Sequence, residues 1–151
     1  ILGICGGYQM LAEVIDDPVE SGGGAVEGLG LLPTRVDFHA EKTLGRPAGA
    51  WGGQPVVGYE IHHGIVTAEA GEPFLDGVRV GNTWGTIWHG AFENDGFRRA
   101  WLTRVAADAG SAWRPDPDAV GFAVRREQML DELADALAEH ADLDALLALA
   151  R

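Results

Sequence analysis

The hydrophobic pattern predicts mainly strands over the first ninety residues, interrupted by one helix, and helices over the remainder. Apolar and alternating runs predict strands over residues 1–4, 34–38, 55–62, 79–80 and 83–89, the last two joined by the turn Gly81-Asn82. Helical spacing predicts helices over residues 7–15, 97–109, 120–137 and 142–147, the third of them facing the core. Stretches rich in glycine or proline predict loops at 21–24, 41–54 and 111–116. This order predicts an α/β fold with a mainly parallel sheet flanked by helices.

The candidate chemistry concentrates at the first predicted corner, Gly3-Ile4-Cys5-Gly6-Gly7-Tyr8-Gln9-Met10. An apolar run precedes Cys5 and helix-forming residues follow it, so the thiol is expected between a strand and a helix. Glycines allow a sharp turn and a close approach of substrate to the backbone. The N–H groups at the start of a helix favour the reactive thiolate. The alternative is a small buried cysteine without a chemical role.

Composition narrows the class of protein. The chain has 151 residues, of which 46% are hydrophobic and 23% charged, which is enough for one globular domain. A single cysteine excludes an internal disulfide and favours a reducing, cytoplasmic location. The sequence has neither a membrane-length apolar run nor a signal-peptide pattern. Its net charge of −12 argues against nucleic acid and anionic membranes as partners.

A cysteine nucleophile needs a base, and the chain offers five histidines. His89 is the strongest candidate, because it ends a predicted strand and precedes a glycine. His62 and His63 are adjacent, so on a strand they point to opposite faces. Since no cysteine cluster accompanies them, no metal site is expected.

Three motifs together resemble a known family. Residues 3–10 resemble the nucleophile elbow of class I (triad-type) glutamine amidotransferases. Two later motifs resemble those of the cobyric acid synthases, Gly58-Tyr59-Glu60-Ile61-His62-His63-Gly64 and Gly85-Thr86-Ile87-Trp88-His89-Gly90-Ala91-Phe92. Their order and spacing agree over essentially the whole chain. The resemblance implies that residues 1–151 form a flavodoxin-like glutaminase domain whose amino-terminal part is missing.

The resemblance also implies a role for each site residue. Cys5 would attack the side-chain amide of glutamine and form a γ-glutamyl thioester. His89 would act as general base and then protonate the departing ammonia. The backbone N–H of Gly6 would stabilise the oxyanion, and Gln9 would order the substrate pocket.

The sequence leaves open which group orients His89. Class I enzymes typically carry Glu two residues after the histidine, whereas Ala91 stands there in this chain. Glu60 is placed slightly ahead of Glu93 and Asp95, because its strand is expected near the same sheet edge. A backbone carbonyl or a water molecule is a further alternative, and Glu60 could equally be a strand carboxylate bonded locally.

The chain starts at Ile1, directly on the predicted Cys5 strand. We therefore expect the carboxy-terminal piece of a longer protein, one that is poorly stable or inactive alone. The resemblance implies an upstream synthetase domain, absent from this chain, that uses ATP and Mg²⁺ to amidate a corrin substrate. Residues 1–151 contain no P-loop pattern, so no cofactor is expected in this piece.

The leading hypothesis is a glutaminase that supplies ammonia for amidation of adenosylcobyrinic acid a,c-diamide in cobalamin biosynthesis. Two alternatives share the Cys–His chemistry: cobyrinic acid a,c-diamide synthase and the complex that amidates lipid II. A third is a catalytically silent domain that docks onto a synthetase, favoured by Ala91 and opposed by the presence of Cys5, Gly6 and His89 together. A cysteine peptidase or hydrolase is a fourth, opposed by the two later motifs.

Overall fold

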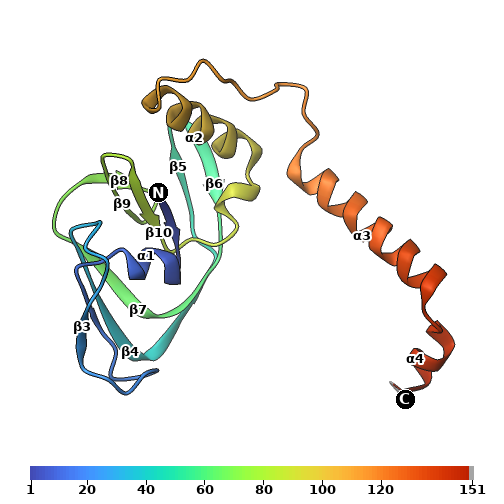
Figure 1. Cartoon of the computed structure of the whole chain (residues 1–151), viewed down its shortest axis with the longest axis horizontal. Coiled ribbons are helices and arrows are strands. Elements are labelled where there is room, and N and C mark those ends of the chain that lie inside the picture. The colour runs from blue at the N-terminus through green and yellow to red at the C-terminus, as the bar shows by residue number, and fades with distance from the viewer. Residues whose placement is uncertain (150–151) are drawn as a thin grey trace. The chain divides into compact units, whose positions relative to one another are not determined.

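The computed structural model describes residues 1–149 and divides the chain into two compact units, the first spanning Ile1–Pro115 and the second beginning at Asp116. Figure 1 labels their elements. The first unit contains β1 (Leu2–Ile4), α1 (Gly6–Met10), β2 (Val14–Asp16), β3 (Ala25–Glu27), β4 (Thr34–Gly45), β5 (Ala48–Trp51), β6 (Gln54–Val57), β7 (Glu60–Ala68), β8 (Glu72–Phe74), β9 (Gly77–Val80), β10 (Thr83–Thr86), the 3₁₀ turn η1 (Ala91–Glu93) and α2 (Asp95–Asp108). The second unit contains α3 (Phe122–His140) and α4 (Leu143–Leu149).

The first unit is built on three small sheets. Their strand orders are β1-β10-β9-β8, β3-β2-β4-β7 and β5-β6. Among the described strand pairs, β1–β10 and β2–β4 are parallel, while the others are antiparallel. The α/β class is therefore confirmed, but the prediction of a mainly parallel sheet is wrong for these residues. The reason is that short turns join most of these strands, whereas a parallel pair needs a long crossover.

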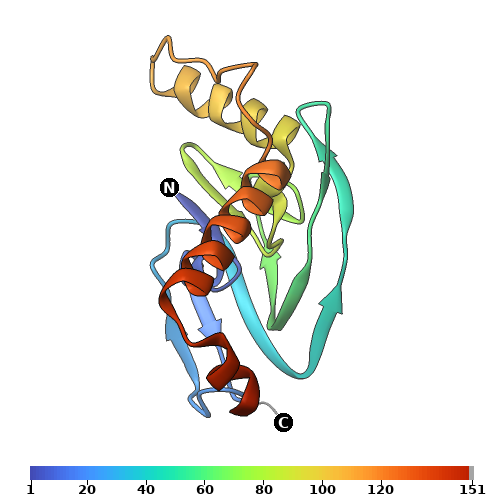
Figure 2. The same cartoon turned by 90° about the vertical axis from the view of Figure 1, so that its right-hand side faces the viewer.

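The loop predicted over residues 41–54 is also wrong. β4 continues through this region and pairs with β7 as far as Gly45, after an irregularity in register. β5 and β6 then form a hairpin around Gly52 and Gly53, whose φ angles of 55° and 76° suit a tight turn. Figure 2 shows this hairpin, coloured teal to green, along one side of the unit. Backbone pairing forms these strands although β5 carries glycine and alanines and β6 carries a proline.

The first predicted helix is shorter than expected. It ends at Met10, and the residues predicted to complete it form β2 instead. Val14 and Ile15 are β-branched, which favours extended backbone, and they pair with Arg35 and Val36 of β4. The strand pairing therefore outweighs the helical spacing at this point.

The hairpin of β9 and β10 and the three later helices confirm their predictions. Asp142 caps α4, its carboxylate accepting a hydrogen bond from the N–H of Ala145 at 3.0 Å. α3 has no buried residue. The expectation that it faces the core concerns the placement of the two units and stays a prediction.

Aromatic side chains form the larger core of the first unit. Phe74 and Phe97 are completely buried, and Trp51 meets each of them edge-on with ring centroids 5.9 Å apart. Trp84 packs edge-on against Phe74 at 4.9 Å. Such edge-on pairs add to the stabilisation from burial alone. A second cluster lies around α1 and consists of Tyr8, Leu11, Leu32, Val78 and Ile87.

We predict that Gly85→Ala destabilises the first unit. A Cβ at position 85 would lie 2.0 Å from Cδ2 of Tyr8, whose ring is 2% exposed and cannot move outward freely. Overpacking of this kind costs about 1–3 kcal/mol of unfolding free energy. Denaturant unfolding measures the loss. Gly24→Ala is the matched control, because no described atom lies within 4 Å of its added methyl group. Equal stability of the two variants would contradict the prediction.

Candidate active site

Cys5 lies at the corner between β1 and α1, as the sequence predicts. Its N–H donates to the carbonyl oxygen of Thr86 at 2.9 Å, which ties the corner to the end of β10. Its φ of 50° and ψ of −115° are unusual for a residue with a side chain. Strained backbone of this kind is typical of a nucleophile elbow, where it exposes the reactive atom between strand and helix.

Gly3 permits the tight packing behind this corner. A Cβ at Gly3 would lie 2.7 Å from the carbonyl oxygen of Gly7, from Cα of Tyr8 and from Cδ1 of Leu11. The absence of a side chain therefore lets α1 pack closely against β1, directly behind the half-buried Cys5.

Gly6 has a different environment from Gly3. Within the described part of the chain, no atom lies within 4 Å of the place that a Cβ on Gly6 would occupy. The packing of this unit therefore does not require glycine at position 6, which is exposed directly beside the thiol. The open space fits the expectation that substrate approaches the backbone there.

The electrostatic environment differs from the expectation that the helix start favours the thiolate. Burial raises the pKa of the Cys5 thiol above its ordinary value, and the negative charge of Asp76 raises it further. The backbone N–H of Gly6 acts in the opposite direction but does not outweigh burial. α1 has only five residues, so the helix dipole that could stabilise a thiolate at its start is small. The thiol is therefore the resting form, and reaction needs a base.

His89 lies beyond the end of β10, at the same sheet edge as Cys5. Its N–H and carbonyl exchange hydrogen bonds with those of Tyr59 at 2.9 and 3.0 Å. The two side-chain rings stack, with centroids 4.9 Å apart and an interplanar angle of 11°. These contacts join the two later motifs and fix the backbone of the candidate base.

The His89 ring carries the clearest chemical signal at the site. Its Nε2 atom is buried and has no hydrogen-bond partner among the described residues. A buried ring nitrogen without a partner is costly, and such groups gather at functional sites. The structure thus brings Cys5 and His89 to one sheet edge and leaves Nε2 of His89 without a hydrogen-bond partner among the described residues.

Gln9 lies in α1, at its border with β7, and Glu60 is the first residue of β7. The side-chain amide of Gln9 donates to the carbonyl oxygen of Gly64 at 3.4 Å. The carboxylate of Glu60 lies 3.5 Å from Nε2 of His62, whose Nδ1 lies 2.8 Å from the carbonyl oxygen of Gly64. Glu60 is thus bonded to a histidine other than His89. No described bond joins Glu60 to His89, so its orienting role stays a prediction.

Asp76 is a site residue that sequence reasoning missed. It lies in the turn between β8 and β9, and its carboxylate accepts hydrogen bonds from Thr86 and Ile87 at the end of β10. Burial raises the pKa of this carboxyl, and the charge of Glu60 raises it further, against the effect of the hydrogen bonds. In the sequence, Leu75-Asp76-Gly77 is merely a turn signal, and only the fold shows what it faces.

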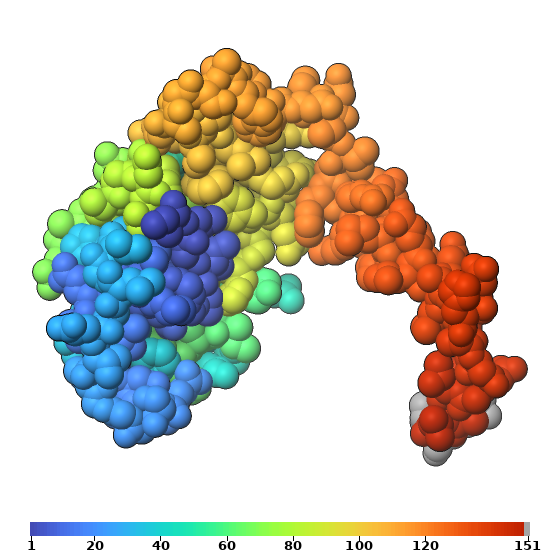
Figure 3. All heavy atoms as spheres, in the orientation of Figure 1, coloured from blue at the N-terminus to red at the C-terminus, as the bar shows by residue number. Residues whose placement is uncertain are grey.

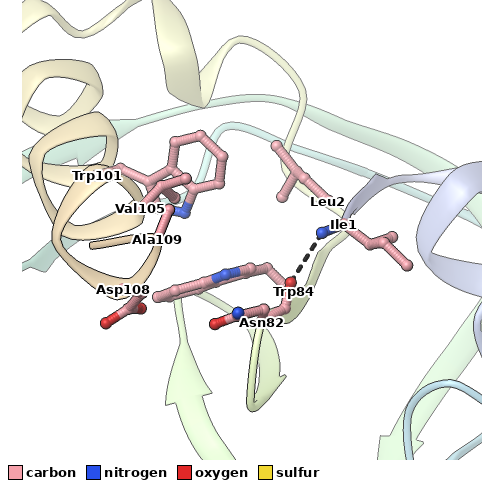
Figure 4. A pocket seen from close by; sticks show the side chains of 8 residues that line it. All are labelled: Ile1, Leu2, Asn82, Trp84, Trp101, Val105, Asp108 and Ala109. Atoms are coloured by element: carbon pink, nitrogen blue, oxygen red, sulfur yellow. Dashed lines mark hydrogen bonds between the residues drawn. The ribbon is translucent and has the colours of Figure 1, made fainter. Parts of the chain in front are cut away.

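An apolar cavity of about 160 Å³ lies elsewhere in the first unit (Figure 4). It is beside the start of the chain, whose dark blue atoms are visible at the surface in Figure 3. Ile1 is exposed. The cavity lining includes the carboxylate of Asp108, which forms an ion pair with the Arg79 guanidinium, with Oδ2 and Nη2 2.6 Å apart. Its lining residues are Ile1, Leu2, Asn82, Trp84, Trp101, Val105, Asp108 and Ala109. Since none of these is a predicted site residue, the cavity is not the candidate active site.

Residues 1–149 offer neither a metal-binding cluster nor a membrane-spanning helix. They contain no group of three or more histidine, cysteine, aspartate or glutamate side chains arranged to hold a metal ion. None of their helices combines the length and apolar character needed to cross a membrane.

Comparison with protein families decides the class of this domain. The model of the "CobB/CobQ-like glutamine amidotransferase domain" matches residues 1–97, which contain Cys5, both later motifs and the turn of Asp76. The chain belongs to this family. It is therefore a glutamine amidotransferase domain, and the resemblance inferred from three motifs is confirmed.

Curated relatives agree with this CobB/CobQ-like assignment. The chain is 60% identical to a cobyric acid synthase of Streptomyces coelicolor over 97% of its own length and 29% of that protein. It is 56% identical to a cobyric acid synthase of Cutibacterium acnes, over 100% of its length and 32% of that protein. The chain thus spans about a third of the length of these relatives.

We predict that Gly6→Ala impairs glutamine hydrolysis without destabilising the fold. The new methyl group meets no described atom of the protein, and alanine favours a helix over glycine, so unfolding should change by less than about 1 kcal/mol. The same methyl group enters the open space beside Cys5, so kcat/KM for glutamine should fall at least about tenfold. Glutamate release and thermal unfolding measure the two effects.

Gly3→Ala is the matched control for this substitution. Its methyl group meets three atoms at 2.7 Å, so stability and activity should fall together. Full activity of Gly6→Ala would show that substrate does not use the space beside Cys5.

Proposed function

We propose that this domain hydrolyses glutamine and supplies the ammonia with which a cobyric acid synthase amidates its corrin substrate. The observation that carries the proposal is the placement of Cys5, in a strained corner, at the same sheet edge as His89, whose Nε2 is buried without a partner among residues 1–149. The names of the curated relatives support the choice of acceptor, since the Streptomyces coelicolor and Cutibacterium acnes proteins are both cobyric acid synthases.

In the first half of the reaction, His89 removes the proton from the Cys5 thiol as sulfur attacks the side-chain carbonyl carbon of glutamine. A base is needed because the pKa of this thiol is raised. The N–H of Gly6 donates to the oxygen that becomes negatively charged. His89 then passes its proton to the departing nitrogen, which leaves as ammonia while a γ-glutamyl thioester remains on Cys5.

In the second half, His89 removes a proton from water, and the resulting hydroxide attacks the thioester carbonyl. The carbon–sulfur bond breaks, the sulfur regains a proton, and glutamate leaves. Gln9, bonded to Gly64 across the border of α1 and β7, would hold one wall of the substrate pocket. The reciprocal backbone bonds of His89 with Tyr59 support its orientation without a carboxylate, an alternative that the sequence leaves open.

The remaining chemistry belongs to a longer protein. We propose that a synthetase domain uses ATP and Mg²⁺ to activate carboxylates of adenosylcobyrinic acid a,c-diamide in the cytoplasm, and that ammonia from this domain completes the amide. The domain described here supplies neither a P-loop pattern nor a described metal-binding group, so no step at Cys5 is assigned to ATP or Mg²⁺.

We predict that Cys5→Ser in the full-length protein separates the two activities. Because the serine hydroxyl is a far weaker nucleophile than a thiolate, glutamine-dependent amidation should fall by at least about a thousandfold. Amidation with added ammonia should stay within about twofold of the wild type, because ammonia does not require the thioester. Product mass and glutamate release measure these activities with ATP, Mg²⁺ and the corrin diamide.

Three results would contradict the proposal. Normal glutamine use by Cys5→Ser would exclude Cys5 as the nucleophile. Loss of the ammonia-dependent reaction would show that the two roles cannot be separated. A wild-type protein that releases no glutamate would favour a silent docking domain.

A further inference from the structure

The Asp76 carboxylate lies outside the mechanism above but is tightly connected to its scaffold. One of its oxygens accepts a hydrogen bond from the hydroxyl of Thr86 at 2.5 Å. Both oxygens lie 3.2 Å from the N–H of Ile87. The residue keeps an exposed surface, yet its charged end is turned to the protein. The Asp76 carboxylate thus binds one hydroxyl and one backbone N–H at the end of β10, and these bonds hold the turn against that strand.

Thr86, the residue that Asp76 holds, supports both sides of the candidate site. It is completely buried, and its carbonyl oxygen accepts the hydrogen bond from the N–H of Cys5. Its hydroxyl, while donating to Asp76, accepts a hydrogen bond from the N–H of Trp88 at 3.1 Å. Trp88 directly precedes His89. The Asp76 carboxylate therefore fixes Thr86. Thr86 in turn binds the backbone of Cys5 and that of Trp88, the residue before His89.

The turn that presents Asp76 has an unusual backbone. Leu75 has a φ of 54°, a conformation that leucine rarely adopts, although its side chain packs against the aromatic core. Gly77 lies so close to β10 that a Cβ there would be 2.2 Å from the carbonyl oxygen of Gly85. Strained residues persist where the surrounding structure requires them, and they gather at functional sites. Here the strain brings the carboxylate to the end of β10.

We propose that Asp76 is a positioning residue for glutamine hydrolysis, which through Thr86 and Ile87 holds the Cys5 corner and the His89 segment in register. This inference rests on the proposed function of the domain. Asp76 touches neither the substrate nor the reacting atoms in this account. A misplacement of reacting groups by about 1 Å can cost about a hundredfold in rate, so removing the Asp76 clamp should lower kcat more than it raises KM.

Asp76 also has an electrostatic effect that a purely structural residue would lack. Its negative charge adds to the burial that raises the pKa of Cys5, and likewise adds to the burial that raises the pKa of Tyr8 to about 12. Glu60 is the other charged group that acts on Asp76. Neutralising Asp76 should therefore lower the pKa of Cys5 and increase its thiolate fraction at neutral pH.

The decisive variant is Asp76→Asn, tested in the full-length protein. Asparagine keeps the size of the side chain, and its oxygen at the Oδ1 position still faces the Thr86 hydroxyl and the Ile87 N–H. It loses the negative charge that strengthens both bonds, and it places an amide N–H₂ donor where Oδ2 accepts from the N–H of Ile87. We expect kcat for glutamine hydrolysis to fall about 10- to 100-fold, with KM within about threefold of the wild type. At a fixed pH of about 7.5, below the ordinary pKa of cysteine, alkylation of the Cys5 peptide by iodoacetamide should become faster.

Glu72→Gln is the matched control, since it neutralises a carboxylate on the neighbouring strand β8. Glu72 is 75% exposed and contacts only the Arg79 guanidinium, at 3.5 Å, among the described ion pairs. Both its kcat and its alkylation rate should match the wild type. The proposal is overturned if Asp76→Asn keeps kcat within twofold, or if its Cys5 alkylation slows or stays unchanged.

A second pair of variants covers the case in which Asp76→Asn does not fold. Thr86→Ser keeps the hydroxyl and should retain kcat within about threefold, whereas Thr86→Val removes it and should lose at least about tenfold. Equal activity of these two variants would overturn the positioning role. If the wild type itself releases no glutamate, the proposed function fails, whereas the alkylation comparison of wild type and Asp76→Asn still tests the action of Asp76 on Cys5.

Discussion

Leu2, Gly3 and Ile4 pair in parallel with Trp84, Gly85 and Thr86, and the active corner depends on this short pairing. Parallel strands bring their carboxyl ends to the same edge of a sheet. β1 ends beside Cys5, the proposed nucleophile, and β10 leads within three residues to His89, the proposed base. The N–H of Cys5 donates to the carbonyl oxygen of Thr86 at 2.9 Å, which extends the pairing by one residue and joins the Cys5 corner to the end of β10.

The close approach of backbones around this pairing explains several residues at once. Tyr8 lies on Gly85, where any side chain would collide with its ring, and Gly77 lies so close that a Cβ there would meet both the Gly85 carbonyl oxygen and the Tyr8 ring. The first contact docks α1 onto the sheet and the second brings the Asp76 turn to the end of β10. Cys5, His89 and Asp76 are thus placed by glycines that carry no chemistry of their own.

The sequence predicts the strand ends at which Cys5 and His89, the candidate nucleophile and base, lie, because local signals mark them. Cys5 stands among glycines, and His89 follows a β-rich run that ends in glycine. The sequence fails where long-range contacts decide the structure. Backbone pairing turns the glycine-rich residues 41–54 into strands, and the role of Asp76 appears only when its turn meets β10. Glu60 shows the same limit, since its described partner is His62, two residues away.

The covalent step at Cys5 is the central claim, and trapping the γ-glutamyl thioester tests it most directly. The full-length protein would be mixed with glutamine, quenched in acid during turnover and digested, and the peptide containing Cys5 analysed by mass spectrometry. The account predicts that this peptide gains one γ-glutamyl group, that the group is lost in hydroxylamine, and that Cys5→Ala shows neither the adduct nor glutamate release. Glutamate release by Cys5→Ala, or an adduct on another residue, would contradict it.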